Sequence, residues 1–477
     1  MSKFPFRNEK DDLDELIARY ESFKSGKATY YFEEDQFERI IDHYLDDDNF
    51  KAANEVTDLA IAQYPYSASF YLSKANLEII YKRYEQALML IDQAEMFDST
   101  DVDLYILKTD AFLALERHEE AAKVLWSVLE KFEGEEKTEL LFELSEVYDD
   151  YEEFEKVFDC LEMVLEIDPE NEEALYKIGF WTEFTGRFEE SISLHRQIIE
   201  EYPYNKLAWF NSGTAYQGLK LHEKAADAYL YAIAIDEKFD VAWRNLADAY
   251  MRLRNYKDAI DALQKVVALA MPDEIIFEAL AYCYAKLDKP ALSRQHYRKA
   301  LHMKPEEASL YHSIGVSYLR EGNAVQAIKN LEKAVAIKPK KTDFLLSLSQ
   351  AYFLNNDFEK AVGPVTQSLA IRPKSLVPWE HLLKNFYALG AYGEGLKASS
   401  LAAEETGRPE IFEYYKAYFQ FGMGNKKEGL FLLQNAVKAA PKYLKKFMSL
   451  DPKVLKYPGV AELIVQNKTS RKKGSTN

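Results

Sequence analysis

The chain has 477 residues, a net charge of −19, 48% hydrophobic residues and two cysteines. It has no run of 18 apolar residues, and its first ten residues include four charged ones and no long apolar stretch, so we expect neither a membrane span nor a secretory signal peptide. Cys160 and Cys283 lie at apolar helical positions, and we expect both to be reduced core residues of a cytoplasmic protein.

The charge is unevenly distributed along the chain. Residues 1–170 carry 44 acidic and 17 basic side chains, whereas residues 171–477 carry 35 acidic and 43 basic ones. Nucleic-acid binding needs a concentrated basic surface, so this distribution argues against it. The acidic arm, residues 1–170, and the mildly basic arm, residues 171–477, suggest different protein partners, and self-association by attraction between the arms of two copies is a further possibility. The alternative is that the acidic surface only keeps a long chain soluble.

The N-terminal segment, residues 1–33, is predicted to hold a loose stretch at 1–10 followed by one amphipathic helix. Leu13, Leu16, Ile17 and Tyr20 recur at helical spacing between Asp11 and Lys24, and the opposite face is charged. This pattern is expected of a helix that caps the end of a stacked array.

From residue 34 to residue 443 a pattern of helical length restarts every 34 residues. The column that shows it best is a small residue in the second half of each repeat: Ala53, Ala87, Ala121, Ala225, Ala259, Ala327 and Ala361. A fixed period of this length predicts stacked helix-turn-helix repeats, three acidic ones at 34–135 and nine more at 138–443. Prolines are predicted to end the second helices: Pro65, Pro169, Pro203, Pro305, Pro339, Pro373 and Pro441.

The period slips once. Gly134, Glu135, Glu136 and Lys137 join the third and fourth repeats and add two residues to the period, beside an acidic run at 149–155. We expect a bend between the acidic arm and the rest of the chain at this point. After the repeats, residues 444–467 are predicted to form two short capping helices and residues 468–477 a basic disordered tail.

The sixth repeat carries the most specific motif. Trp209, Ser212, Gly213 and Tyr216 follow the spacing of the tetratricopeptide repeat, and the ninth repeat has Tyr311, Ile314, Gly315 and Tyr318 at the same spacing. The chain therefore resembles the tetratricopeptide repeat family over about 410 residues. The resemblance implies an all-α, right-handed solenoid of about twelve repeats whose first helices line a concave surface that binds peptides or helices.

Mapping that surface position by position gives a candidate peptide groove of aromatic, amide and charged side chains: Phe142, Tyr176, Phe180, Phe210, Asn211, Arg244, Asn245 and Asp248. Rings would hold the side chains of an extended peptide, and paired amides would bond its backbone. The second candidate is a basic ladder at the thirteenth position of three successive repeats, made of Arg252, Lys286 and Arg320, which would face an acidic segment. Solenoid packing and a solvated charged face are the alternatives.

No catalytic, metal or cofactor site is predicted. The eight histidines are scattered singly and no cysteine or histidine cluster has ligand spacing. The chaperone-binding carboxylate clamp of some family members is not supported, because Tyr176, Phe180 and Val241 occupy positions that need Lys or Asn. We therefore expect a non-enzymatic scaffold or adaptor that binds other proteins. The alternative is a structural subunit of a larger assembly that uses its convex face or its ends.

Overall fold

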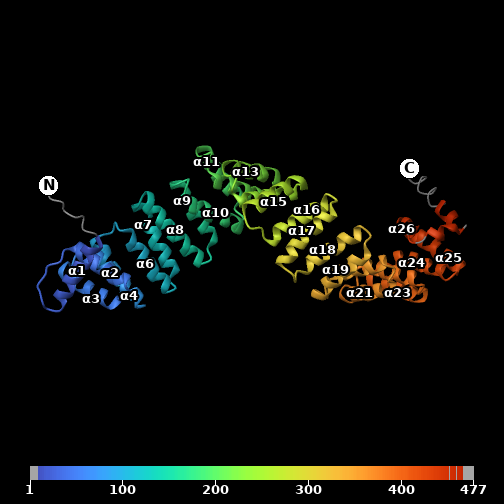
Figure 1. Cartoon of the computed structure of the whole chain (residues 1–477), viewed down its shortest axis with the longest axis horizontal. Coiled ribbons are helices and arrows are strands. Elements are labelled where there is room, and N and C mark those ends of the chain that lie inside the picture. The colour runs from blue at the N-terminus through green and yellow to red at the C-terminus, as the bar shows by residue number, and fades with distance from the viewer. Residues whose placement is uncertain (1–8, 449, 451, 458, 466–477) are drawn as a thin grey trace. The chain divides into compact units, whose positions relative to one another are not determined.

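The structure is a computed structural model that describes residues 9–448, 450, 452–457 and 459–465. Every regular element in these residues is a helix, so the chain is an all-α repeat solenoid, as predicted (Figure 1). Residues 1–8 of the segment predicted to be loose, and the predicted tail at 468–477, lie outside the described residues. No helix in the described part is long and apolar enough to cross a membrane.

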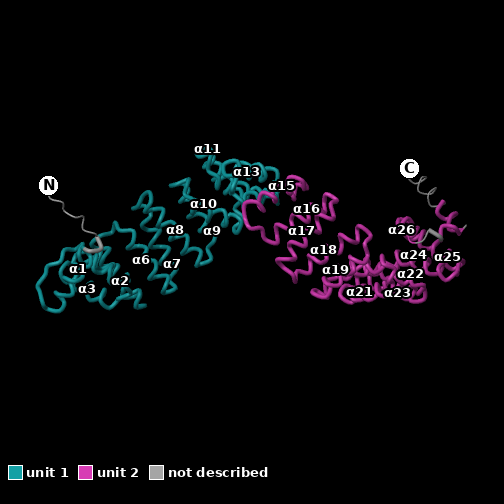
Figure 2. The backbone as a smooth tube through the Cα atoms, viewed as in Figure 1, with its two compact units in different colours: residues 1–249 teal, residues 250–477 magenta. Residues whose placement is uncertain are grey.

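The chain divides into two compact units, residues 1–249 and 250–477 (Figure 2). The helices of unit 1 are α1 (Glu9–Lys24), α2 (Glu34–Asp46), α3 (Phe50–Gln63), α4 (Ala68–Ile80), α5 (Tyr84–Phe97), α6 (Val102–Ala114), α7 (His118–Val128), α8 (Gly134–Asp150), α9 (Phe154–Ile167), α10 (Glu172–Thr185), α11 (Phe188–Glu201), α12 (Lys206–Gly218), α13 (His222–Ile235) and most of α14 (Asp240–Arg252).

The helices of unit 2 are α15 (Tyr256–Leu269), α16 (Glu274–Lys286), α17 (Pro290–Met303), α18 (Ala308–Arg320), α19 (Ala324–Ile337), α20 (Thr342–Leu354), α21 (Phe358–Ile371), α22 (Leu376–Leu389), α23 (Tyr392–Thr406), α24 (Pro409–Gly422), α25 (Lys426–Ala439) and α26 (Leu444–Met448). Within each unit the two helices of a repeat pack together, and first helices of successive repeats also touch, as α10 touches α12 and α18 touches α20.

The small column lies where the two helices of a repeat approach most closely. All seven of its alanines are fully buried. Glycine on the first helix also allows close contact, because a Cβ atom added to Gly213 of α12 would lie 2.6 Å from the ring of Tyr229 on α13. Small side chains at these points therefore set the spacing of the helices, as predicted.

The prolines predicted to end helices do so. Each of the seven follows the last residue of a second helix by two positions, as Pro203 follows Glu201 at the end of α11. A proline lacks the N–H that the next helical turn would need. Pro364, in contrast, lies inside α21.

The turn between the two helices of a repeat has one backbone feature in common. Its residue at the fifteenth position of the repeat has a positive φ, whether or not it is glycine. The non-glycine examples are Asp48, Lys82, Glu116, Glu152, Lys220, Arg254, Asp288 and Asn356, and the glycines are Gly186, Gly322, Gly390 and Gly424. The left-handed conformation therefore belongs to the corner itself, and not to one residue type.

The insertion between the third and fourth repeats does not form a loop. α7 has 11 residues and is followed by a short 3-10 turn at Leu129–Lys131, whereas α8 begins at Gly134 and has 17 residues. The extra residues therefore lengthen the first helix of the fourth repeat. The boundary between the two compact units lies about one hundred residues further on.

Helices cap both ends of the repeats. α1 begins at Glu9, two residues before the predicted start, and buries Leu16 and Tyr20 against Phe37 and Ile41 of α2. At the other end, α26, a 3-10 helix at Pro452–Lys456 and a helical stretch at 459–465 bury Phe447, Val454 and Val460. Each cap covers an apolar face that has no further repeat beside it.

Candidate functional site

Three exposed aromatic side chains form a stripe on α10. Tyr176, Phe180 and Phe184 follow one another at intervals of four residues, and their side chains are 60%, 60% and 57% exposed. Residues four apart lie on one face of a helix. Tyr176 and Phe180 were predicted from the sequence, whereas Phe184 was not, although the same spacing would have found it.

The stripe is positioned by the rest of its helix. Asn171 caps α10 by accepting a hydrogen bond from the N–H of Ala174 at 3.0 Å, and the helix ends at Gly186 with φ 77°. The opposite face of α10 buries Leu175, Ile178 and Trp181. Since that face already supplies the core contacts, the stripe is not needed for the packing of the repeat.

Neighbouring rings fix one end of the stripe. Phe184 lies edge-on to Phe154 of α9 with the ring centroids 4.8 Å apart, and Phe180 stacks on Phe184 at 6.0 Å. The ring of Trp181 stacks on Phe154 at 5.5 Å and lies edge-on to Phe180 and Phe184 at 5.1 and 5.4 Å. Rings held in this way lose little side-chain entropy when a ligand binds.

Phe142 and Phe210 are half-buried and act mainly as packing. The ammonium of Lys177 lies 5.0 Å from the ring centroid of Phe142, and Phe210 tilts against Tyr229 and Phe239 at 5.7 and 5.1 Å. The packing alternative therefore describes these two positions better than an open groove does.

Asn211 is the clearest correction to the predicted groove. Its side chain is 3% exposed, and its Nδ2 donates to the carbonyl of Leu175 at 2.7 Å and faces Nε2 of His195 at 3.1 Å. It also occupies the space left by Gly179, where an added Cβ would lie 2.7 Å from Oδ1. Asn211 therefore joins α12 to α10 inside the wall, and its amide is closed to a ligand.

The expected amide pair is consequently absent. Asn245 is half-buried, and its Nδ2 lies 3.5 Å from the hydroxyl of Tyr229, an interior partner. Asp248 is half-buried and accepts from Nε2 of Gln217 at 2.9 Å, and Arg244 beside it is also half-buried. Asn245, Arg244 and Asp248 thus remain as polar positions on α14, without the predicted partner for Asn245.

An acidic hollow that the sequence analysis did not identify lies on the first helices of unit 1. It has a volume of about 390 Å³ and is lined from α2, α4 and α6 by residues that include Asp42, Asn76 and Asp110. These three residues share the ninth position of their repeats, which is also the position of Phe180. The hollow and the stripe therefore lie on the same side of the repeats, which we call the inner face.

Crowding of carboxylates affects the acidity of this face. Burial raises the pKa of Asp42 and of Asp110 above the ordinary range, with like charges adding to the effect at Asp42. On α8, burial together with the charges of Asp110, Glu146 and Glu139 raises the pKa of Glu143 to about 7. A basic ligand would relieve this repulsion.

Replacing Glu143 with glutamine should stabilise unit 1 at pH 8 by about 1 kcal/mol, after allowance for partial exposure to solvent. The pKa of Glu143 is higher in the folded state than in the unfolded state, so the wild-type carboxylate lowers stability as pH rises from 4.5 through 7. Amide hydrogen exchange of α8 at pH 5 and pH 8, which reports the local free energy of opening, measures the effect. Glu200→Gln, an exposed change on α11, is the control, and an equal effect of both variants at pH 8 would contradict the prediction.

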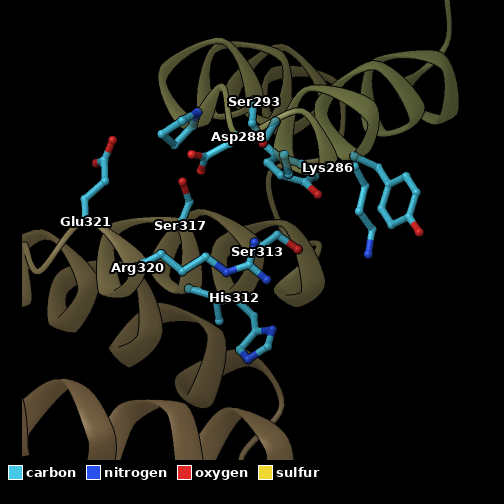
Figure 3. A pocket seen from close by; sticks show the side chains of 13 residues that line it. Lys286, Asp288, Ser293, His312, Ser313, Ser317, Arg320 and Glu321 are labelled. Atoms are coloured by element: carbon cyan, nitrogen blue, oxygen red, sulfur yellow. The ribbon is translucent and has the colours of Figure 1, made fainter. Parts of the chain in front are cut away.

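The basic ladder is partly gathered by the structure. Lys286 and Arg320 are exposed and line one cavity of unit 2 (Figure 3), while Arg252 is exposed near the end of α14.

The two cysteines are fully buried, at the core positions predicted for them. Among the described residues, no cluster of histidine, cysteine and carboxylate side chains is placed to hold a metal ion.

Comparison with known proteins places these repeats in a family. Models of the tetratricopeptide repeat match residues 207–239, 241–273 and 318–377. These segments of the chain are therefore tetratricopeptide repeats. No curated protein matches the chain.

Several solved structures are similar in fold. YrrB, described as a TPR protein with an unusual peptide-binding site, is 19% identical, with 39% of this chain and 96% of that chain covered and a TM-score of 0.36. The C-terminal part of a TPR repeat-containing protein from Cytophaga hutchinsonii is 17% identical, with coverages of 53% and 98% and a TM-score of 0.44. The Cut9–Hcn1 hetero-tetramer of the APC/C is 11% identical, with coverages of 85% and 98% and a TM-score of 0.36.

Proposed function

We propose that this protein is a non-enzymatic cytoplasmic scaffold that binds an extended segment of a partner protein along the inner face of unit 1. The observation that carries the proposal is the aromatic stripe, three large rings exposed in a row on a helix whose core face is already filled. Exposed aromatic side chains are the residues most enriched at the energetic centres of protein interfaces.

The surroundings of the stripe suggest the chemistry of the segment. On α8, the first helix of the preceding repeat, the charges of Asp110 and Glu146 act on Glu143. The ammonium of Lys177 lies 3.6 Å from Glu146 and 2.8 Å from Glu173. A segment with an aromatic or large aliphatic anchor for the stripe and lysine or arginine beside it would meet both features. Phe142, Phe210, Arg244, Asn245 and Asp248 would border this site, and Asn211 would hold its wall.

Peptide display against the full-length protein tests the proposal. Peptides selected by the wild type should carry such an anchor flanked by basic residues. Their affinity should fall about tenfold in Phe180→Ala and in Phe184→Ala, since truncating an anchor costs about 1.4 kcal/mol or more. Because both side chains are exposed, circular dichroism of the variants should match that of the wild type.

Tyr204→Ala is the matched control, because this tyrosine is 84% exposed but lies outside the stripe. It should bind the selected peptides as the wild type does. If the two stripe variants also bind with wild-type affinity, the stripe is not the anchor. The alternative of an assembly subunit that uses its convex face or its ends would then take first place.

A further inference from the structure

A second candidate site lies in unit 2 and does not depend on the aromatic stripe. A cavity of about 240 Å³ opens between α16, α17 and α18 (Figure 3). Lys286 enters it from the last turn of α16 and Arg320 from the last turn of α18, each at the thirteenth position of its repeat. The regular period of the chain thus brings two cations to one hollow.

The two cations have no carboxylate partner. Within the described residues neither Lys286 nor Arg320 forms an ion pair, and the ammonium of Lys286 lies 5.0 Å from the ring centroid of Tyr282. Glu321, at the edge of the cavity, is already neutralised by Arg294, with Nη1 and Oε2 2.7 Å apart. Asp288 is the remaining lining carboxylate, and Figure 3 shows it on the α16–α17 side, across from Arg320.

Neutral groups of the cavity complete a set of donors. The hydroxyl of Ser293 is fully buried and has no hydrogen-bond partner among the described residues, although it belongs to the cavity wall. An unsatisfied buried hydroxyl is costly, and a ligand oxygen would relieve that cost. Ser313 adds a second hydroxyl from α18, beside Arg320, and this hydroxyl also shares a hydrogen bond with Tyr297 (Figure 3).

His312 does not add a third charge to the cavity. Its Nε2 is 2.9 Å from the hydroxyl of Ser347, its ring stacks on Phe344 at 4.5 Å, and burial lowers its pKa below the ordinary value. The site therefore presents two fixed cations and hydroxyl donors, which suits a group with a double negative charge and several oxygen atoms.

We propose that this cavity binds a phosphomonoester carried on a segment of a partner protein. A dianionic phosphate uses both cations, whereas a single carboxylate would leave one of them without a counter-charge. Arg252 occupies the same position one repeat earlier. The ligand chemistry differs from that of the stripe, and neither site requires the other.

The test is a binding titration of the full-length protein with a fluorescein-labelled glycine pentapeptide that has one central phosphoserine. The probe has no aromatic residue, so failure of the stripe would not affect it. We expect it to bind at least about tenfold more tightly than its serine and glutamate twins. Lys286→Gln and Arg320→Gln should each weaken it about tenfold, the loss expected for one charge-assisted hydrogen bond.

Two further variants separate binding from folding. Ser293→Ala should weaken the phosphopeptide severalfold while stability stays unchanged or rises, because it removes a buried unsatisfied group. Lys329→Gln, an exposed lysine of α19 outside the cavity, should bind as the wild type does.

Several results would overturn the proposal. Equal affinity for the phosphoserine and serine peptides would remove the site, and equal affinity for the glutamate peptide would make it a carboxylate site. An equal loss in Lys329→Gln would reduce the binding to general charge attraction. If inorganic phosphate competes with the same affinity as the peptide, the cavity is a site for a free anion, and the partner-segment part of the proposal is wrong.

Discussion

Replacing Gly213 with alanine should destabilise the sixth repeat by about 2–3 kcal/mol, although alanine favours helices more than glycine does. The added methyl group would lie 2.6 and 2.7 Å from two ring carbons of Tyr229. Tyr229 is fully buried, and its hydroxyl lies 3.1 Å from Oε1 of Gln217 and 3.5 Å from Nδ2 of Asn245, so the ring cannot move aside freely. The α12 and α13 helices would have to separate instead.

Amide hydrogen exchange is the suitable measurement, because repeat arrays open locally and a single unfolding free energy describes them poorly. Protection should fall in α12 and α13 and much less in distant repeats. Gly393→Ala is the control, since a Cβ atom there meets nothing within 4 Å. An unchanged exchange pattern in Gly213→Ala would mean that the contact with Tyr229 does not set the helix spacing.

Acidification should loosen the contact between α10, α11 and α12 through His195. Its ring is fully buried: Nδ1 donates to the carbonyl of Ser191 at 2.7 Å, and Nε2 accepts from Asn211 at 3.1 Å. Burial lowers the pKa of His195 to about 4. Protonation would also place an N–H of the ring against the N–H of Asn211, so the charged form is excluded from this site.

The direction with pH follows from proton linkage. Between pH 6.5 and pH 4 the unfolded chain binds a proton at His195 that the folded chain does not, so stability falls as pH falls through this window. The full loss is about 3 kcal/mol at the acid end. Above pH 7.5 the histidine is neutral in both states and contributes no pH dependence.

The comparison of His195→Gln with the wild type at each pH isolates this effect from that of the carboxylates. Exchange protection of α10–α12 should fall with acid more steeply in the wild type than in the variant. His302→Gln, a change at an exposed histidine, should follow the wild type at every pH. If wild type and His195→Gln differ by the same amount at pH 7.5 and pH 4.5, His195 does not control the acid response.

The helices were predictable because the same small and helix-ending residues recur at the same positions in successive repeats. The buried alanine marks seven repeats and the proline two residues beyond the second helix also marks seven, in each case at nearly the same place, and agreement among copies removes the ambiguity of any one motif. The longer α8 was not predictable in the same way. Two additional residues can enter a loop or a helix, and the period alone does not choose between them.

The inner face was harder to predict because the 34-residue period shows which side of the repeat a side chain lies on, but not how deeply it is buried. Asn211 occupies a position that is half-buried in most other repeats, yet Gly179 on the neighbouring first helix leaves room for it to turn into the wall. Phe184 was missed for a different reason. It lies at the thirteenth position of its repeat, and that position was assigned a role only in the three repeats where it holds a cation. The acidic hollow was not predicted because its polar side chains, Asp42, Asn76 and Asp110, come from three successive repeats and become visible as a group only when the ninth positions of those repeats are compared.

The left-handed corners inside the repeats bear on how this chain could be tuned to a different temperature. A non-glycine residue in that conformation carries a strain of order 1 kcal/mol, and Lys82, Glu116, Glu152 and Lys220 each carry it in a different repeat. In a linear array such strain is local, so the strain at each corner mainly lowers the free energy of opening of its own repeat. Exchanging these residues for glycine one at a time would adjust the melting order of neighbouring repeats without touching either binding surface.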